Sequence, residues 1–323
     1  MAYSALPGWI VGAAALVVLA GACTPLQARE SARIPTLGEG EDTAARVGQL
    51  AFRGGIALSS DQPGFGELSD LRVLDAGAGF VAVTDRGFIV TGRLDYGADG
   101  ALAAARDLAV RPLPDLGIPP LHMVRRDAEG LAILPDGRWA VSFELEHRIA
   151  IYPPGFAGEP ERLPLPPGLD RLRLNGGIEA LTALPDGGLV AIAEAGDEQG
   201  RHRAWRWRAG AWDPFTYRAE PPFQPTGLAV LPDGDLLVLE RRASWFGGLS
   251  ARVVRVPLAA VAAGATVSGR ELGRLGPPLI MENFEGIDAR RTPEGRTLVY
   301  LLSDDNEEPL FRTVMLMFEL VPD

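Results

Sequence analysis

The chain has 323 residues, a formal net charge of −11 and 47% hydrophobic residues, which suffices for one large domain or two small ones with a packed core. All 31 basic residues are arginines, so Schiff-base chemistry and a P-loop lysine are excluded. The acidic balance also argues against nucleic acid as a partner, because counterion release requires a basic face.

The N-terminal segment is typical of an export signal. Trp9–Ala22 is an apolar run of 14 residues, which is too short to span a bilayer comfortably. It leads into Cys23, the only cysteine of the chain, in a context that resembles a bacterial lipobox. We therefore expect residues 1–22 to be a signal peptide, and the exported product to be anchored in the periplasm by a lipid on Cys23. Ordinary Ala-x-Ala cleavage, with Cys23 lost or unmodified, is the alternative.

The mature chain is expected to begin with a tether. Residues 23–46 are polar and lack a periodic pattern, so we interpret them as a flexible tether and residues 47–323 as the folded domain. With one cysteine at most, no disulfide can stabilise that domain. Leu50–Ser59 is a strand-like segment without a hairpin partner in the adjacent sequence.

An internal repeat dominates the domain. In its clearest copies a short apolar run meets Pro-Asp-Gly, a turn sequence, and a second apolar run follows, which predicts a β-hairpin. The copies begin at Ser69, Glu129, Glu179, Thr226 and Glu285, at spacings of 60, 50, 47 and 59 residues. Further strand-like segments, such as Arg148–Pro154 and Ala251–Leu258, bring each unit to about four strands.

Four apolar strands in roughly 50 residues are typical of a propeller blade. We therefore predict an all-β propeller with five recognisable blades, although the two longer spacings leave room for a sixth. The last copy ends about one strand short of a blade, and we expect Leu50–Ser59 to close the ring as its outer strand. A β-sandwich of hairpins is the alternative, but it does not explain the regular acidic residues at the ends of the repeats.

Acidic residues recur at both ends of the predicted hairpins. The first residue of the first strand of an antiparallel hairpin lies beside the last residue of the second strand. The predicted pairs are Ser69 with Asp85, Glu129 with Glu144, Glu179 with Glu194, Thr226 with Glu240, and Glu285 with Asp304. If the first strands are innermost, eight carboxylates converge at one mouth of the central channel. The simpler alternative for any one pair is turn chemistry or an ordinary strand end.

Such a ring of like charges must be compensated. Two like charges about 4 Å apart cost roughly 4 kcal/mol at an effective dielectric near 20, so the ring must raise pKa values, bind cations or recruit arginines. Arginines and neutral oxygen donors are available nearby, namely Arg86, Arg241, Arg242, Asn175, Asn283 and Asn306. Oxygen donors favour a hard cation, calcium before magnesium. A soft metal is not expected, because the mature body has no thiol and His122, His147 and His202 lack a paired ligand spacing.

The motifs DAEGLAILPDG, GGIEALTALPDG, PTGLAVLPDGDLLVLER and NFEGIDARR…LLSDDN resemble the bacterial "esterase-like activity of phytase" (phytase-like) proteins over roughly residues 50–320. The resemblance implies a secreted or periplasmic propeller and, by analogy with propeller phytases, calcium. It implies that Glu129, Glu179 and Glu285 face the channel, that Asp85, Glu144, Glu194, Glu240 and Asp304 surround them, and that Arg86 and Arg241 contact substrate. We therefore expect catalytic roles for the three glutamates, and substrate contacts from the two arginines together with Asn175 and Asn283. The expected metal ligands are Asp85, Glu144, Glu194, Glu240, Asp304 and Asp305.

We expect a calcium-dependent hydrolase of phosphate or carboxylic esters, acting on a small anionic or ester substrate. The cation would polarise the substrate, one of the three glutamates would act as general base, and the arginines would hold an anionic group. A serine nucleophile is disfavoured, because no G-x-S-x-G elbow follows a strand and Ser142 and Ser303 lie inside predicted strands.

The alternative function is a non-catalytic envelope propeller that binds a ligand or protein across its mouth. Aromatic residues between Trp205 and Tyr217, and the loop at Trp245-Phe246, are compatible with it, although alternating tryptophans more often pack between blades. In either case we expect a monomer, with membrane contact only through the N-terminal lipid.

Overall fold

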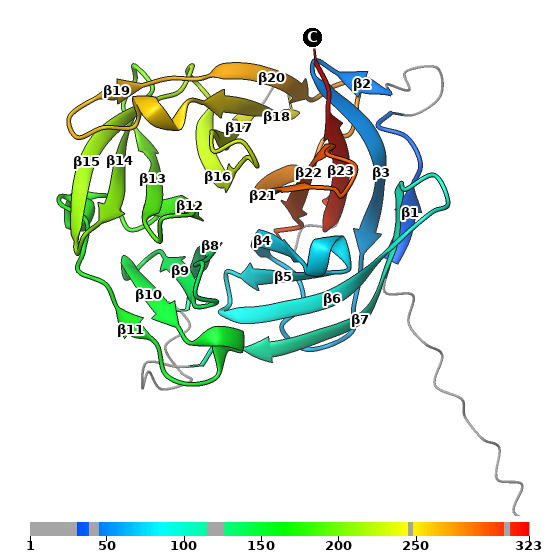
Figure 1. Cartoon of the computed structure of the whole chain (residues 1–323), viewed down its shortest axis with the longest axis horizontal. Coiled ribbons are helices and arrows are strands. Elements are labelled where there is room, and N and C mark those ends of the chain that lie inside the picture. Colours follow the sequence, from blue (N-terminus) through cyan, green and yellow to red (C-terminus); the bar gives the residue numbers. More distant parts are fainter. Residues whose placement is uncertain (1–30, 39–44, 115–125, 245–247, 307–310, 323) are drawn as a thin grey trace, which may run out of the picture.

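The computed structural model describes residues 31–38, 45–114, 126–244, 248–306 and 311–322. The expected signal peptide, Cys23, His122 and the Trp245-Phe246 loop lie outside these described residues. The described residues form five β-sheets arranged around a central axis, as Figure 1 shows, with four short 3-10 turns: η1 (Asp75–Gly77), η3 (Pro154–Phe156), η4 (Leu169–Arg171) and η5 (Leu258–Ala260). The five-bladed propeller is confirmed, and the part of the chain that the structure describes contains no sixth blade.

Each blade begins at the axis and runs outward. Blade 1 comprises β4 (Leu68–Leu74), β5 (Gly79–Thr84), β6 (Phe88–Tyr96) and β7 (Leu102–Pro112). Blade 2 comprises β8 (Ala128–Ile133), β9 (Trp139–Phe143), β10 (Arg148–Tyr152) and β11 (Glu161–Arg162). Blade 3 comprises β12 (Ile178–Ala183), β13 (Leu189–Gly196), β14 (Arg201–Arg208), β15 (Ala211–Arg218) and β19 (Thr266–Val267). Blade 4 comprises β16 (Gln224–Val230), β17 (Leu236–Ser244), β18 (Gly248–Val256) and β20 (Arg270–Leu275).

Blade 5 joins the two ends of the described chain. It comprises β21 (Asn283–Arg291), β22 (Thr297–Asp304), β23 (Val314–Leu320), β3 (Leu50–Leu58), β1 (Ser31–Ile34) and the short β2 (Arg46–Val47). β3 pairs antiparallel with β23, from Ala57 opposite Val314 to Leu50 opposite Leu320, and Figure 1 shows it directly outside β23. The prediction that this segment closes the ring is therefore confirmed.

Residues 31–38 differ from the expectation of a flexible tether. β1 pairs with β3 over four residues, from Ser31 opposite Leu58 to Ile34 opposite Gly55. Leu37 is buried against the hydrophobic cluster between blades 4 and 5, and Gly38 forms a bridge with Leu279. A four-residue strand in a polar segment gives too short a periodic signal to be recognised in the sequence.

The hydrophobic core lies between the blades. Because successive side chains of a strand point to opposite faces, each blade supplies apolar residues to both neighbours. In β22, Leu298, Tyr300 and Leu302 face blade 1, whereas Val299 and Leu301 face blade 4. Five buried clusters of this kind fill the five interfaces between blades. Both faces of the strands are apolar, as the propeller prediction assumes, because each blade packs against two neighbours.

A buried ion pair spans the central axis. The Arg72 guanidinium donates to Asp70 at 3.1 Å and also to four backbone carbonyls, those of Leu71, Leu181 (2.7 Å), Leu228 (3.1 Å) and Ile287 (3.0 Å). Asp70 in turn accepts from the Leu131 amide at 2.9 Å. Together the two side chains bond to the innermost strands of all five blades.

Candidate functional site

A β-bulge places one residue of every innermost strand at the same level of the axis. In each blade the pairing between the first and second strands slips by one residue near the start of the first strand. The bulges fall at Ser69, Glu129-Gly130, Glu179, Thr226 and Glu285, which are the five repeat starts. A bulge bends its strand and re-aims a side chain, and bulges are frequent beside active sites. We call the end of the axis where these residues lie the mouth.

The glycines that follow three of the bulged residues allow neighbouring blades to approach closely. A Cβ on Gly130 would lie 2.6 Å from the carbonyl oxygen of Glu179, and one on Gly227 would lie 2.5 Å from that of Glu285. In the Glu-Gly and Thr-Gly pairs of the repeat, the first residue therefore directs its side chain to the mouth. The glycine leaves room for the backbone of the next blade.

Three acids lie close together in the half of the mouth formed by blades 1 and 2. Asp85, Asp127 and Glu129 are half-buried, and one carboxylate oxygen of each lies within 4.8 Å of the others. Asp85 accepts a hydrogen bond of 2.6 Å from Ser69, but within the described residues no arginine is in ion-pair distance of the three. Burial and the charges of Asp85 and Glu179 raise the pKa of Glu129 well above its usual value.

In the half formed by blades 3 to 5, Arg241 pairs with two of the acids. Its guanidinium donates to Glu285 at 2.5 Å, to Glu194 at 3.5 Å and to the side-chain oxygen of Asn283. Asn283 also donates to Glu285 at 2.8 Å. Although burial opposes the charged form, these carboxylates raise the pKa of Arg241 further. The ring is thus divided into a charge-paired half and an open half.

Two further acids lie beside the ring with perturbed pKa values. Glu144 accepts hydrogen bonds from the backbone amides of Gly176 (2.9 Å) and Gly177, yet burial raises its pKa to about 7. Burial and the charge of Glu285 raise the pKa of Asp304 to about 8. In both cases desolvation outweighs the hydrogen bonds that favour the carboxylate.

Glu179 lies between the two halves. It is half-buried, and no hydrogen bond to its carboxyl group is seen in the described part of the chain. Burial and the neighbouring Glu194 raise its pKa well above the usual value, whereas Arg241 acts in the opposite direction. The Glu179 carboxyl group therefore holds a proton more tightly than an exposed glutamate does.

The prediction that Glu240 belongs to the ring is wrong. Its carboxylate is fully buried, accepts a hydrogen bond from the Tyr217 hydroxyl and pairs with Arg252 at 2.5 Å. Because Arg241, not Glu240, pairs with Gln224 at the mouth, the equivalent of Asp304 in blade 4 is an arginine. A count from the turn aspartates already indicates this: Glu144, Glu194 and Arg241 each follow their turn aspartate by eight residues.

The remaining predicted residues are spread over the mouth. Arg86 pairs with Glu67 at 2.8 Å and donates to the Phe65 carbonyl at 2.9 Å. Asp305 accepts from the Glu67 amide at 3.2 Å and from the Thr313 hydroxyl at 2.9 Å. Asn175 is exposed in the loop before β12. Arg86 and Asp305 therefore both contact Glu67.

Asp127 is the functional candidate that the sequence argument missed. It stands two residues before Glu129, as Asn283 stands two residues before Glu285, so the repeat itself contained the signal. Burial and the charge of Glu67 raise its pKa to about 6, while Arg148 acts in the opposite direction.

The other sequence candidates are structural. Ser142 accepts a hydrogen bond from the Gly130 amide, and Ser303 donates to the Arg312 carbonyl at 2.6 Å, so both serines brace strands. Trp205 and Trp207 pack in the interface between blades 2 and 3.

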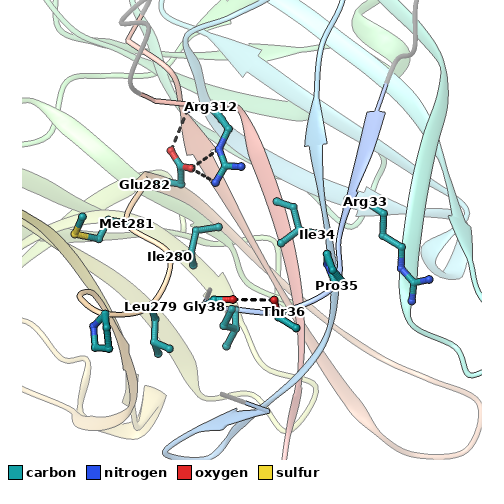
Figure 2. A pocket seen from close by; sticks show the side chains of 12 residues that line it. Arg33, Ile34, Pro35, Thr36, Gly38, Leu279, Ile280, Met281, Glu282 and Arg312 are labelled. Atoms are coloured by element: carbon teal, nitrogen blue, oxygen red, sulfur yellow. Dashed lines mark hydrogen bonds and ion pairs between the residues drawn. The ribbon is translucent and has the colours of Figure 1, made fainter. Parts of the chain in front are cut away.

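A cavity of about 630 Å³ lies apart from the ring, between the residues that follow β1 and the loop before β21. Figure 2 shows that Glu282 and Arg312 face each other at one end of it, with oxygen–nitrogen distances of 2.7 and 2.8 Å. Ile34, Leu279 and Ile280 supply apolar walls. The charges of Glu282 and Arg312 therefore compensate each other at this end of the cavity.

Several solved structures resemble this chain, one of them with a TM-score above 0.5. The α-L-arabinofuranosidase of Podospora anserina, in complex with cellotriose, is 12% identical with a TM-score of 0.53, covering 82% of this chain and 94% of that one. A luciferin-regenerating enzyme is 12% identical with a TM-score of 0.45, covering 82% and 80%. A streptogramin B lyase is 12% identical with a TM-score of 0.43, covering 89% and 97%. At these identities the likeness concerns the fold alone.

Comparison with curated proteins gave no match. Among the described residues, no helix is long and apolar enough to cross a membrane. The phytase-like family, described as "esterase-like activity of phytase", matches residues 63–307, which include every acid of the ring. This chain is therefore a member of the phytase-like family.

Proposed function

We propose that this protein is a metal-dependent hydrolase of phosphate or carboxylic esters, with a calcium ion held at the open half of the ring. The observation that carries the proposal is the group formed by Asp85, Asp127 and Glu129, whose carboxylate oxygens lie within 4.8 Å of one another without an arginine partner in the described chain. In a purely structural ring we would expect arginines beside the acids throughout, as Arg241 lies beside Glu194 and Glu285 in the other half.

The donor set fits a hard cation. It consists of three half-buried carboxylates without a thiol or imidazole, and calcium accepts such oxygen donors in flexible geometries. When bound, such a cation polarises a carbonyl or phosphoryl oxygen and lowers the pKa of water.

We assign the general base to Glu179. Glu129 belongs to the metal group and Glu285 is engaged by Arg241 and Asn283, whereas Glu179 has a raised pKa and a carboxyl group without a hydrogen bond in the described residues. A carboxylate whose pKa is raised is a stronger base and accepts a proton from water more readily than an ordinary carboxylate. Arg241, whose side chain remains 20% exposed, can orient an oxygen of the substrate.

The test separates metal binding from proton transfer. Glu129→Gln should weaken calcium binding at least tenfold, because it removes one of three anionic ligands. Glu179→Gln should leave calcium binding within about threefold of the original protein but reduce turnover by roughly 10²- to 10⁴-fold, the usual contribution of a general base. Turnover is measured on p-nitrophenyl acetate and p-nitrophenyl phosphate with calcium present.

Glu294→Gln is the matched control, because Glu294 is exposed in the turn between β21 and β22, at the opposite end of the strands from the ring. It should change neither quantity. Unchanged turnover in Glu179→Gln would remove Glu179 from the mechanism, and the absence of any hydrolysis in the original protein would contradict the enzymatic proposal.

We also propose that the protein is exported and lipidated at Cys23, on the motif described above. Cys23→Ser should release the protein from the membrane fraction into the soluble periplasmic fraction, as judged by immunoblotting. If the original protein is already soluble, ordinary signal cleavage is the better explanation. No contact in the described residues favours the non-catalytic alternative, since Trp205 and Trp207 belong to the packed core.

A further inference from the structure

Arg241 occupies the position that four other blades fill with an acid. In every blade, the residue two positions before the bulge of the innermost strand pairs with a residue of the second strand. In blades 1 to 3 the carbonyls of Glu67, Asp127 and Gly177 accept from the amides of Asp85, Glu144 and Glu194. In blade 5 Asn283 pairs with Asp304, and in blade 4 Gln224 pairs with Arg241. Blade 4 alone thus presents a cation at this level.

The Arg241 guanidinium is surrounded as a bound cation would be. Glu285, Glu194 and Asn283 supply oxygen atoms to its two terminal nitrogens, and Glu179 and Asp304 are close enough to act on its charge. Carboxylate and amide oxygens are also the ligands of a hard divalent cation. The donor set of this half is therefore of the same chemical kind as the group in the open half.

We propose that Arg241 is a built-in counter-cation, which fills the position of a second divalent cation in the half of the ring formed by blades 3 to 5 and so limits the mouth to one bound ion. The inference rests on the proposed function for the first ion. Among the described residues, removing the guanidinium would leave Glu285 with the Asn283 amide and Glu194 with the exposed Arg173 at 3.7 Å. A cluster compensated so weakly must either take up protons or recruit a cation.

The experiment is a calorimetric titration of the chelator-stripped protein with calcium at pH 8, comparing the original protein with Arg241→Gln. We expect one ion per chain in the original protein and two in Arg241→Gln. Arg241→Lys, which keeps the positive charge, should bind one. Arg173→Gln is the matched control, because Arg173 also pairs with Glu194, at 3.7 Å, but from an exposed position at the rim; it too should bind one.

One ion in both the original protein and Arg241→Gln would overturn the inference about Arg241 and leave the proposed function intact. No ion in the original protein but one in Arg241→Gln would support the inference and contradict the resident ion of the proposed function. If Arg241→Gln does not fold in chelator, refolding with millimolar calcium becomes the readout. Recovery of the folded state by calcium, but not by an equal ionic strength of sodium chloride, supports the inference, and failure to recover overturns it.

Discussion

At the scale of single residues, the centre of the molecule holds charges that the sequence argument did not use. Asp70 and Arg72 lie in the first repeat, the most degenerate one, and both are almost completely buried. Their hydrogen bonds reach all five innermost strands. One ion pair thus provides partners for buried backbone carbonyl and amide groups at the central axis. Because a lone arginine in a predicted strand resembles an edge residue, only the closed ring reveals this role.

Removing one partner of this pair should destabilise the whole propeller. Arg72→Met leaves the Asp70 carboxyl group buried and deprives four carbonyls of a donor, so we expect the free energy of unfolding to fall by about 3–5 kcal/mol. The measurement is urea unfolding followed by tryptophan fluorescence. Arg138→Met, at an exposed turn arginine paired with Asp136, is the control and should change stability by less than about 0.5 kcal/mol. A loss as small as that of the control would mean that water replaces the guanidinium.

The ring itself was predictable in part. The recurrence of acids at the hairpin ends identified Glu129, Glu179 and Glu285 because these residues share one repeat position, and position in a repeat is visible in sequence. The exchange of Glu240 for Arg241 was not recognised, because hairpin ends were matched by residue type and not by counting from the turn. Charge compensation across blades depends on contacts such as Arg241 with Glu285, which are 44 residues apart and follow only from ring closure.

At the scale of elements, the bulge is the feature that converts a simple hairpin into a site. A regular hairpin would place Glu285 directly opposite a residue of β22, whereas the bulge leaves it unpaired between Phe284 and Gly286. The hairpins were evident from Pro-Asp-Gly and alternating apolar runs. The bulges were not, because an extra residue in one strand changes the register without changing the composition.

The glycine after the bulge gives this argument a direct test. Gly227→Ala would bring a methyl group within 2.5 Å of the Glu285 carbonyl oxygen, and both atoms belong to the tightly packed inner strands. We expect a loss of about 1–3 kcal/mol in the free energy of unfolding, as for other overpacked positions. Equilibrium unfolding in urea measures this effect.

Ala180→Gly is the control for this substitution. Ala180 follows the bulge in blade 3 and is fully buried, so its inter-blade spacing already accommodates a methyl group. Ala180→Gly should lower the free energy of unfolding by about 1 kcal/mol or less, through backbone entropy and lost packing. If Gly227→Ala is as mild as Ala180→Gly, then the close approach of blades 4 and 5 does not constrain this position.

At the scale of the whole molecule, stability and site chemistry oppose each other. Five apolar interfaces hold the blades together, and they force the acids of the innermost strands into one small region. The number of blades followed from counting repeats, and closure by β3 followed from the missing strand of the last copy. The balance of charge at the mouth could not be foreseen, because it depends on how far burial outweighs hydrogen bonding at each carboxyl group.

That balance predicts how the stability of the metal-free protein depends on pH. Burial raises the pKa of Asp304 to about 8, of Glu144 to about 7 and of Asp127 to about 6. The folded state therefore binds more protons than the unfolded state at these groups between about pH 4 and pH 8. Their contribution to stability is present at low pH and is lost as the pH rises through the folded-state values, at roughly 1.4 kcal/mol per pH unit for each proton.

We therefore expect the urea concentration at the unfolding midpoint of the chelator-treated protein to decrease as the pH is raised from 5 to 9. This is the opposite of the usual loss of stability in acid. Calcium should restore stability, and increasingly so at the higher pH, because a cation stabilises the ionised carboxylates of the folded state and binds the unfolded chain weakly. The measurement is a series of urea titrations over this range, with and without calcium. A midpoint that rises with pH in chelator would mean that arginines, not protons, neutralise the ring, and the open half would then carry no free site for a cation.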